Sequence, residues 1–89
     1  MGDEAIKKRM SRAKRKARMD LESIGFEVIE SNNRPVCLVA KNGDDIRVIR
    51  ICLNKISPAD RLSICTFSEF RREVWCRKEG SEEFSIQKI

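Results

Sequence analysis

The feature that most constrains the fold is a pair of β-rich runs separated by a short turn. Residues 36–40, VCLVA, and residues 46–53, IRVIRICL, are rich in apolar and β-branched side chains. Asn42-Gly43-Asp44-Asp45 lies between them, and Asn and Gly tolerate the positive φ angles of hairpin turns. The sequence therefore predicts a β-hairpin. A four-residue turn would place Cys37 opposite Arg50, with Cys52 on the same face of the sheet.

The segments around this hairpin predict two helices and three further strands. Apolar residues recur at steps of three and four, which predicts an amphipathic helix over about 3–24 that ends at Gly25. This stripe consists of Ile6, Met10, Ala13, Ala17, Asp20/Leu21 and Ile24. The N-cap pattern Ser57-Pro58-Ala59-Asp60 predicts a second helix that runs to about Thr66. Strands are expected over 26–31, 73–77 and 84–89, with turns at 32–35 and 78–83.

The resulting order is helix, three strands, helix, two strands, within one domain that covers residues 1–89. The run 46–53 is apolar on both faces apart from its arginines, which favours a central strand. A helix that connects the third and fourth strands predicts a mixed sheet with a right-handed crossover. The expected fold class is α/β (α+β), with the helices covering the faces of the sheet.

Positive charge is concentrated in one window of the first helix. Residues 7–18, KKRMSRAKRKAR, contain no acid, whereas 11 basic and 14 acidic residues share the remainder. The basic residues of the window are Lys7, Lys8, Arg9, Arg12, Lys14, Arg15, Lys16 and Arg18. Without acids four residues away, these charges repel one another and weaken the helix. We therefore favour contact with a polyanion over a merely solvated face, with nucleic acid ahead of an anionic membrane surface.

The remaining composition favours an intracellular, cytoplasmic protein. No apolar run reaches the length of a membrane span, and no signal peptide is recognisable. The four cysteines lack a Cys-x-x-Cys pair and the chain has no histidine, which argues against a zinc ribbon. We interpret the cysteines as small buried side chains, since a disulfide between Cys37 and Cys52 is conceivable but disfavoured in a reducing compartment.

This element order, together with three short motifs, resembles the PD-(D/E)XK nuclease superfamily. Within it, the likeness is to small proteins similar to archaeal Holliday junction resolvases. The matching segments are residues 25–31, GFEVIES, residues 35–40, PVCLVA, and residues 50–52, RIC. The resemblance implies a restriction-endonuclease-like αβββαβ core, here with an extra C-terminal strand. It also implies a homodimer, because these resolvases usually dimerise.

The chain departs from this family at the positions that would hold its metal. The resemblance places Cys37 at the metal-binding Asp, Arg50 at the second acid and Cys52 at the lysine. Mg²⁺ prefers hard oxygen ligands, and a guanidinium raises the cost of binding any cation nearby. We therefore expect no catalytic residues, no metal and no cofactor. Mg²⁺ would be needed only if the protein were an active nuclease after all.

The leading hypothesis is a nucleic-acid-binding protein on a catalytically degenerate nuclease-like fold, with DNA favoured over RNA. One alternative is an active endonuclease or junction resolvase that uses non-standard acids such as Glu27 or Glu30. Another is a protein-interaction module whose basic helix docks an acidic partner. Double-stranded-RNA-binding domains share the element order, but their basic cluster opens the second helix, where this chain has only Arg61.

Three sets of side chains have both a structural and a functional interpretation. Arg50 is expected to pair with Glu27 or Glu30 on a neighbouring strand, although it could neutralise phosphate. Trp75 is expected to pack in the core or at an interface, although it could stack on a base. Phe67 and Phe70 either close the core or form a patch for self-association, and the sequence does not separate these two possibilities.

Overall fold

The computed structural model describes residues 2–31, 36–65, 67, 69–78, 80 and 83–89, without the side chains of residues 2–4. The elements are α1 (Gly2–Ser23), β1 (Glu27–Glu30), β2 (Leu38–Asn42), β3 (Asp45–Leu53), α2 (Pro58–Ile64), β4 (Arg71–Arg77) and β5 (Phe84–Lys88). The predicted order of elements is confirmed. The predicted turn at 32–35, the end of the second helix at Thr66 and part of the turn at 78–83 lie outside the described residues.

The strands form one mixed sheet in the order β1-β2-β3-β4-β5, with β3 in the centre as predicted. β3 and β4 are parallel and are joined through α2, whereas the other neighbouring pairs are antiparallel. The hairpin is tighter than the four-residue turn that we expected. Asn42 already pairs with Asp45, so only Gly43 and Asp44 form the turn, and Gly43 has a φ of 61°.

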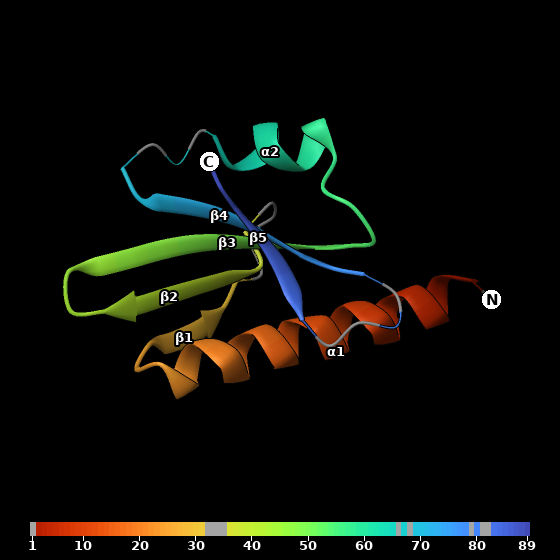
Figure 1. The fold of residues 1–89 in the computed structure, drawn as a ribbon, viewed down its shortest axis with the longest axis horizontal. Helices are drawn as coiled ribbons and strands as arrows, with labels where there is room; N and C mark the ends of the chain where they lie inside the picture. The colour runs from red at the N-terminus through yellow and green to blue at the C-terminus, as the bar shows by residue number, and fades with distance from the viewer. Residues whose placement is uncertain (1, 32–35, 66, 68, 79, 81–82) are drawn as a thin grey trace.

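The two helices lie on opposite faces of this sheet, which gives three layers (Figure 1). α1 contacts β1, β2 and β3, and α2 contacts β3 and β4. Each face has its own apolar cluster, because the side chains of β3 alternate between the two helices. Ile49 and Ile51 belong to the cluster under α1, whereas Cys52 belongs to the cluster under α2 with Ile64. Among the described residues, no helix is long and apolar enough to span a membrane.

α1 lies close to the sheet because its inward stripe carries small side chains at its centre. Ala13, Ala17 and Leu21 are fully buried, and Met10 packs against the same cluster. The predicted stripe is too long at both ends, since Ile6 is 54% exposed and Ile24 is 63% exposed. Gly25 follows the helix with a φ of 98°, as a C-terminal glycine requires. This anchoring fixes which face of α1 points to solvent.

Candidate nucleic-acid interface

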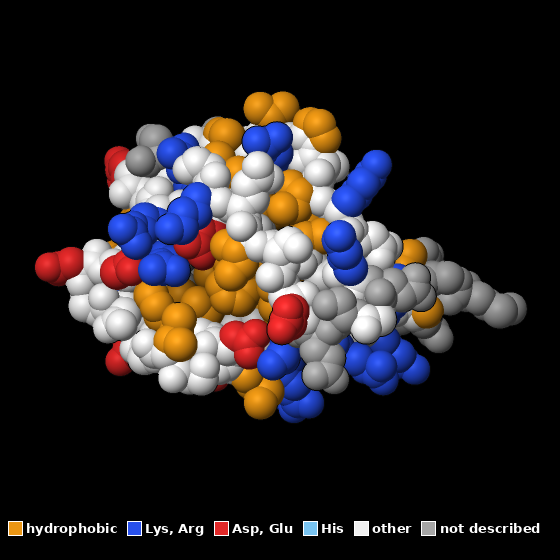
Figure 2. Space-filling view, viewed as in Figure 1, with side chains coloured by type: hydrophobic (Ala, Val, Ile, Leu, Met, Phe, Trp, Pro, Cys, Tyr) orange, Lys and Arg blue, Asp and Glu red, His pale blue; other side chains and the backbone are white. Residues whose placement is uncertain are grey.

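The outward face of α1 is basic and accessible. Lys and Arg side chains gather along the lower side of the molecule, where α1 runs (Figure 2). The exposed cations are Lys7, Lys8, Arg12, Arg15 and Arg18, and the half-buried ones are Arg9, Lys14 and Lys16. The buried alanine stripe faces the sheet, so the cations occupy what remains of the helix surface. The structure thus presents the predicted residues together on one element.

Part of this charge is neutralised, which corrects the view that no acids lie four residues away. Lys16 Nζ lies 2.9 Å from Asp20 Oδ1, and Arg18 Nε lies 3.4 Å from Glu22 Oε1. Both acids follow the window that was counted in the sequence. Arg9 donates a 3.2 Å hydrogen bond to the Asn54 side chain, beyond the end of β3. Among the described residues, no ion pair involves Lys7, Lys8, Arg12, Lys14 or Arg15.

The three positions that correspond to a nuclease metal site do not share one face of the sheet. Cys37 packs against the α1-side cluster, whereas Cys52 lies in the α2-side cluster. Regular pairing of β2 with β3 ends at Leu38 and Ile49, and the Cys37 N–H donates to the Ile49 carbonyl at 2.9 Å. This bond replaces the expected pairing with Arg50, and a shift of one residue turns a side chain to the other face. The prediction that placed Cys37 beside Arg50 and Cys52 was therefore wrong.

Arg50 has a different partner from the one that we expected. Its Nε donates a 2.8 Å hydrogen bond to Asp60 Oδ1 at the start of α2, not to Glu27 or Glu30 on β1. Asp60 also accepts from the backbone and the hydroxyl of Ser57, which completes the predicted helix cap. Burial opposes the charge on Asp60, but the hydrogen bonds from Arg50 and Ser57 outweigh it, so the pKa of Asp60 is lowered. Arg50 is thus tied to the helix cap.

Cys52 is an unfavourable metal ligand in this environment. It is buried beside Cys76, its neighbour on the parallel strand β4, and both thiols are free. Burial, and then the neighbouring Cys76, raise the pKa of the Cys52 thiol to about 12. Metal ions bind the thiolate, which this environment disfavours. Within the described part of the chain, no group of three or more His, Cys, Asp or Glu side chains could hold a metal ion.

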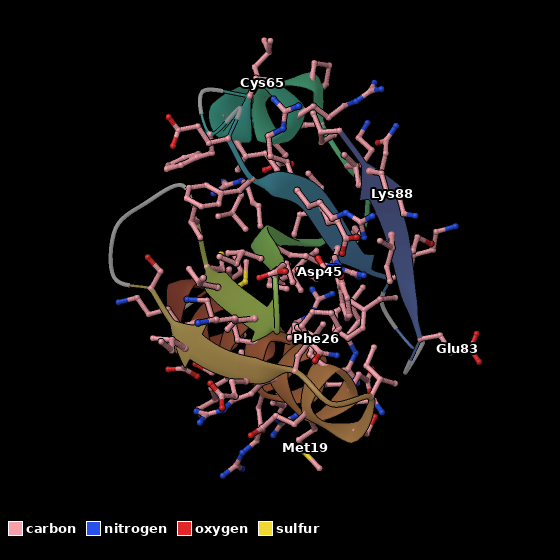
Figure 3. All side chains as sticks on the ribbon, turned by 90° about the vertical axis from the view of Figure 1, so that its left-hand side faces the viewer. Met19, Phe26, Asp45, Cys65, Glu83 and Lys88 are labelled. Atoms are coloured by element: carbon pink, nitrogen blue, oxygen red, sulfur yellow. The ribbon has the colours of Figure 1, made fainter. Side chains whose placement is uncertain are left out.

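A polar network under the sheet escaped the sequence analysis. Glu73, with only 3% of its surface exposed, accepts a 3.0 Å bond from the indole N–H of Trp75 and lies 3.3 Å from Arg47. Arg47 also pairs with Asp45 at 3.0 Å and stacks over the ring of Phe26. Figure 3 shows Asp45 and Phe26 at the same end of the molecule. The alternation of β4 was the available signal, because it places Glu73 and Trp75 on one face.

The remaining aromatic predictions have clear outcomes where the structure describes them. Trp75 is buried and its ring lies 5.3 Å from that of Phe84, so the packing interpretation is confirmed. Phe67 packs against the α2-side cluster, whereas Phe70 is 39% exposed. Glu27 and Glu30 are exposed on β1, at the edge of the sheet.

No family model matches this sequence, and no curated protein matches it. Among solved structures, the chain is similar to Hjc, a Holliday junction resolvase from the archaeal hyperthermophile Archaeoglobus fulgidus. The TM-score is 0.74 at 19% identity, over 90% of this chain and 72% of the resolvase chain. The chain has a resolvase-like nuclease fold. The predicted PD-(D/E)XK fold class, a mixed sheet flanked by two helices, is thereby confirmed.

Proposed function

We propose that this protein binds nucleic acid, with DNA favoured over RNA, through the outward face of α1, and that it does not cut it. The single observation that carries the proposal is the set of α1 cations without an ion-pair partner among the described residues: Lys7, Lys8, Arg12, Lys14 and Arg15. Phosphate contacts from such side chains supply affinity that depends little on sequence.

The helix presents these charges on a fixed support. From Lys7 to Arg18 the helix advances about 16 Å, which is enough to follow several phosphates of one strand. Ala13, Ala17 and Leu21 hold it against the sheet, so the cations need no folding step on binding. Repulsion among the cations destabilises the free helix, and a bound polyanion would relieve it.

The absence of cutting is proposed from the residues at the three family positions. Cys37 and Cys52 offer thiols on opposite faces of the sheet, and Arg50 brings a positive charge that is already paired with Asp60. None of these groups supplies the hard oxygen ligands that Mg²⁺ prefers. Since the similar structure is a Holliday junction resolvase, we propose branched DNA as the first substrate to compare with linear duplex. We also propose a homodimer, which sedimentation analysis tests.

Fluorescence anisotropy with labelled linear and four-way DNA, at rising salt, tests the binding. If the five cations each contact a phosphate, the slope of log K against log salt should approach about −4.5. The combined variant Lys7→Ala/Lys8→Ala should bind more weakly and lower the slope by about 2. Lys55→Ala/Arg61→Ala removes the same charge from exposed positions off α1 and should have little effect. Absence of binding at low salt, or binding that ignores salt, contradicts the proposal.

The inactivity is tested separately with the same DNA substrates. Incubation with Mg²⁺ or Mn²⁺ should give no strand scission beyond that of the buffer. Scission that disappears in Glu27→Ala or Glu30→Ala would establish the nuclease alternative instead. Co-purification of one stoichiometric acidic protein, free of nucleic acid, would favour the interaction module.

A further inference from the structure

A surface hollow lies beside α1, and its positive lining consists of arginines alone. Arg12, Arg15 and Arg18 line it, together with Ser11 and Met19 from the same helix. The four lysines of the basic window, Lys7, Lys8, Lys14 and Lys16, do not line this hollow. Met19 is 60% exposed and points away from the sheet (Figure 3), so the hollow opens toward solvent on the outer side of α1.

The arginines of this hollow differ in how far they are already engaged. Arg18 pairs with Glu22, which also lines the hollow. Arg12 and Arg15 are exposed and make no ion pair with another described residue. They are three residues apart on one helix, so their side chains reach the same side. The hollow therefore has an engaged end at Arg18 and an available end at Arg12 and Arg15.

We propose that the available end holds one internal phosphodiester of the bound nucleic acid, an inference that rests on the proposed function. The planar guanidinium groups of Arg12 and Arg15 match phosphate oxygens with two parallel N–H donors each, which a lysine ammonium cannot do. The Ser11 hydroxyl on the adjacent position is a further donor of the kind that contacts phosphate. Two classes of contact then coexist on α1: charge alone at Lys7 and Lys8, and geometry at Arg12 and Arg15.

Glu30 completes the argument because it brings a carboxylate to the same hollow from β1. With Glu22, it places two negative charges among three positive ones. A phosphate in the hollow is repelled by Glu30, so this residue limits the affinity of the arginines. An internal phosphodiester suits such an open site, since the strand can continue along the basic face of α1.

Charge-preserving substitutions test this site against the general basic face. The variant Arg12→Lys/Arg15→Lys keeps the net charge but should bind a short labelled duplex roughly ten-fold more weakly. The matched control Lys7→Arg/Lys8→Arg also keeps the charge and should bind as the unmodified protein does. Glu30→Gln should bind more tightly, because the repulsion is removed. All these positions are exposed, and circular dichroism checks that each variant is folded.

The outcomes separate the site from the proposed function. If the unmodified protein binds DNA with the expected salt dependence but Arg12→Lys/Arg15→Lys binds equally well, only charge matters and the site is refuted. The site is also refuted if Glu30→Gln leaves the affinity unchanged. A marked preference for duplex with a 5′-phosphate over duplex with a 5′-hydroxyl would show that a terminal phosphate is the ligand, contrary to the assignment. Failure of the unmodified protein to bind at all refutes the proposed function itself.

Discussion

Glu73 offers a direct test of the network that joins β3 and β4 under the sheet. Its carboxylate is almost fully buried, and its two oxygens accept from different side chains. Oε1 accepts from the Trp75 indole at 3.0 Å, and Oε2 accepts from the Arg47 guanidinium at 3.3 Å. The substitution Glu73→Ala removes both acceptors at once and leaves a cavity beside a buried indole.

The expected cost follows from what each partner retains. Trp75 is buried and loses the acceptor of its indole N–H, which costs about 1–3 kcal/mol for an unsatisfied buried donor. Arg47 keeps Asp45 at 3.0 Å, so its charge stays compensated and its share of the loss is about 1 kcal/mol. We expect Glu73→Ala to lower the free energy of unfolding by about 2–4 kcal/mol. Glu73→Gln keeps one acceptor oxygen and should cost about half as much.

Urea unfolding followed by tryptophan fluorescence measures this cost on the one tryptophan of the chain. Each kcal/mol should lower Tm by about 4–8 °C in a domain of this size. Lys16→Ala is the matched control, because it breaks an ion pair whose side chains are 41% and 40% exposed and should cost under about 1 kcal/mol. If Glu73→Ala costs no more than Lys16→Ala, the network does not stabilise the fold and the reasoning is refuted.

Two further predictions concern the opposite face of the sheet. The folded-state pKa of Asp60 is lowered, so its pairing with Arg50 stabilises fully above the unfolded pKa of about 3.9 and is lost as pH falls through the folded value. Urea midpoints between about pH 5 and pH 2.5 should fall less steeply in Asp60→Asn, and equal slopes would contradict this. Burial raises the pKa of Cys52 to about 12, so at about pH 8 a disulfide reagent should modify Cys52 more slowly than the half-buried Cys65. Equal rates, followed by peptide mapping, would argue against a buried neutral thiol.

Much of the architecture was predictable because local signals agreed with the hydrophobic pattern. The Ser57 cap, the glycine after α1 and the β-rich runs each act within a few residues, and all are present as predicted. The hairpin register also agrees with the prediction, although the turn is shorter, because both turns pair Lys41 with Ile46. The strand boundaries shift by one or two residues, which is where hydrogen bonding to neighbours decides the ends.

The candidate site was less predictable, because it depends on small departures from regular geometry and on contacts between distant segments. Cys37 changes faces through one backbone hydrogen bond to Ile49, and no alternation rule includes such a shift. Arg50 was expected to find its acid on a neighbouring strand, yet Asp60 approaches from the helix that follows β3. The two ion pairs within α1 were readable from the sequence, since Asp20 and Glu22 are four residues from their partners.

The sequence by itself determined the order of elements, the central strand and the helix that carries the positive charge. These depend on periodicity, turn residues and charge spacing, which are properties of neighbouring residues. Only the tertiary structure decided which cations stay available, which arginines meet Glu30 in one hollow, and which acids Arg47 and Arg50 pair with. The physical reason is that ion pairs, burial and pKa shifts depend on distances between side chains from different elements, and those distances are set by how α1 and α2 pack on the two faces of the sheet.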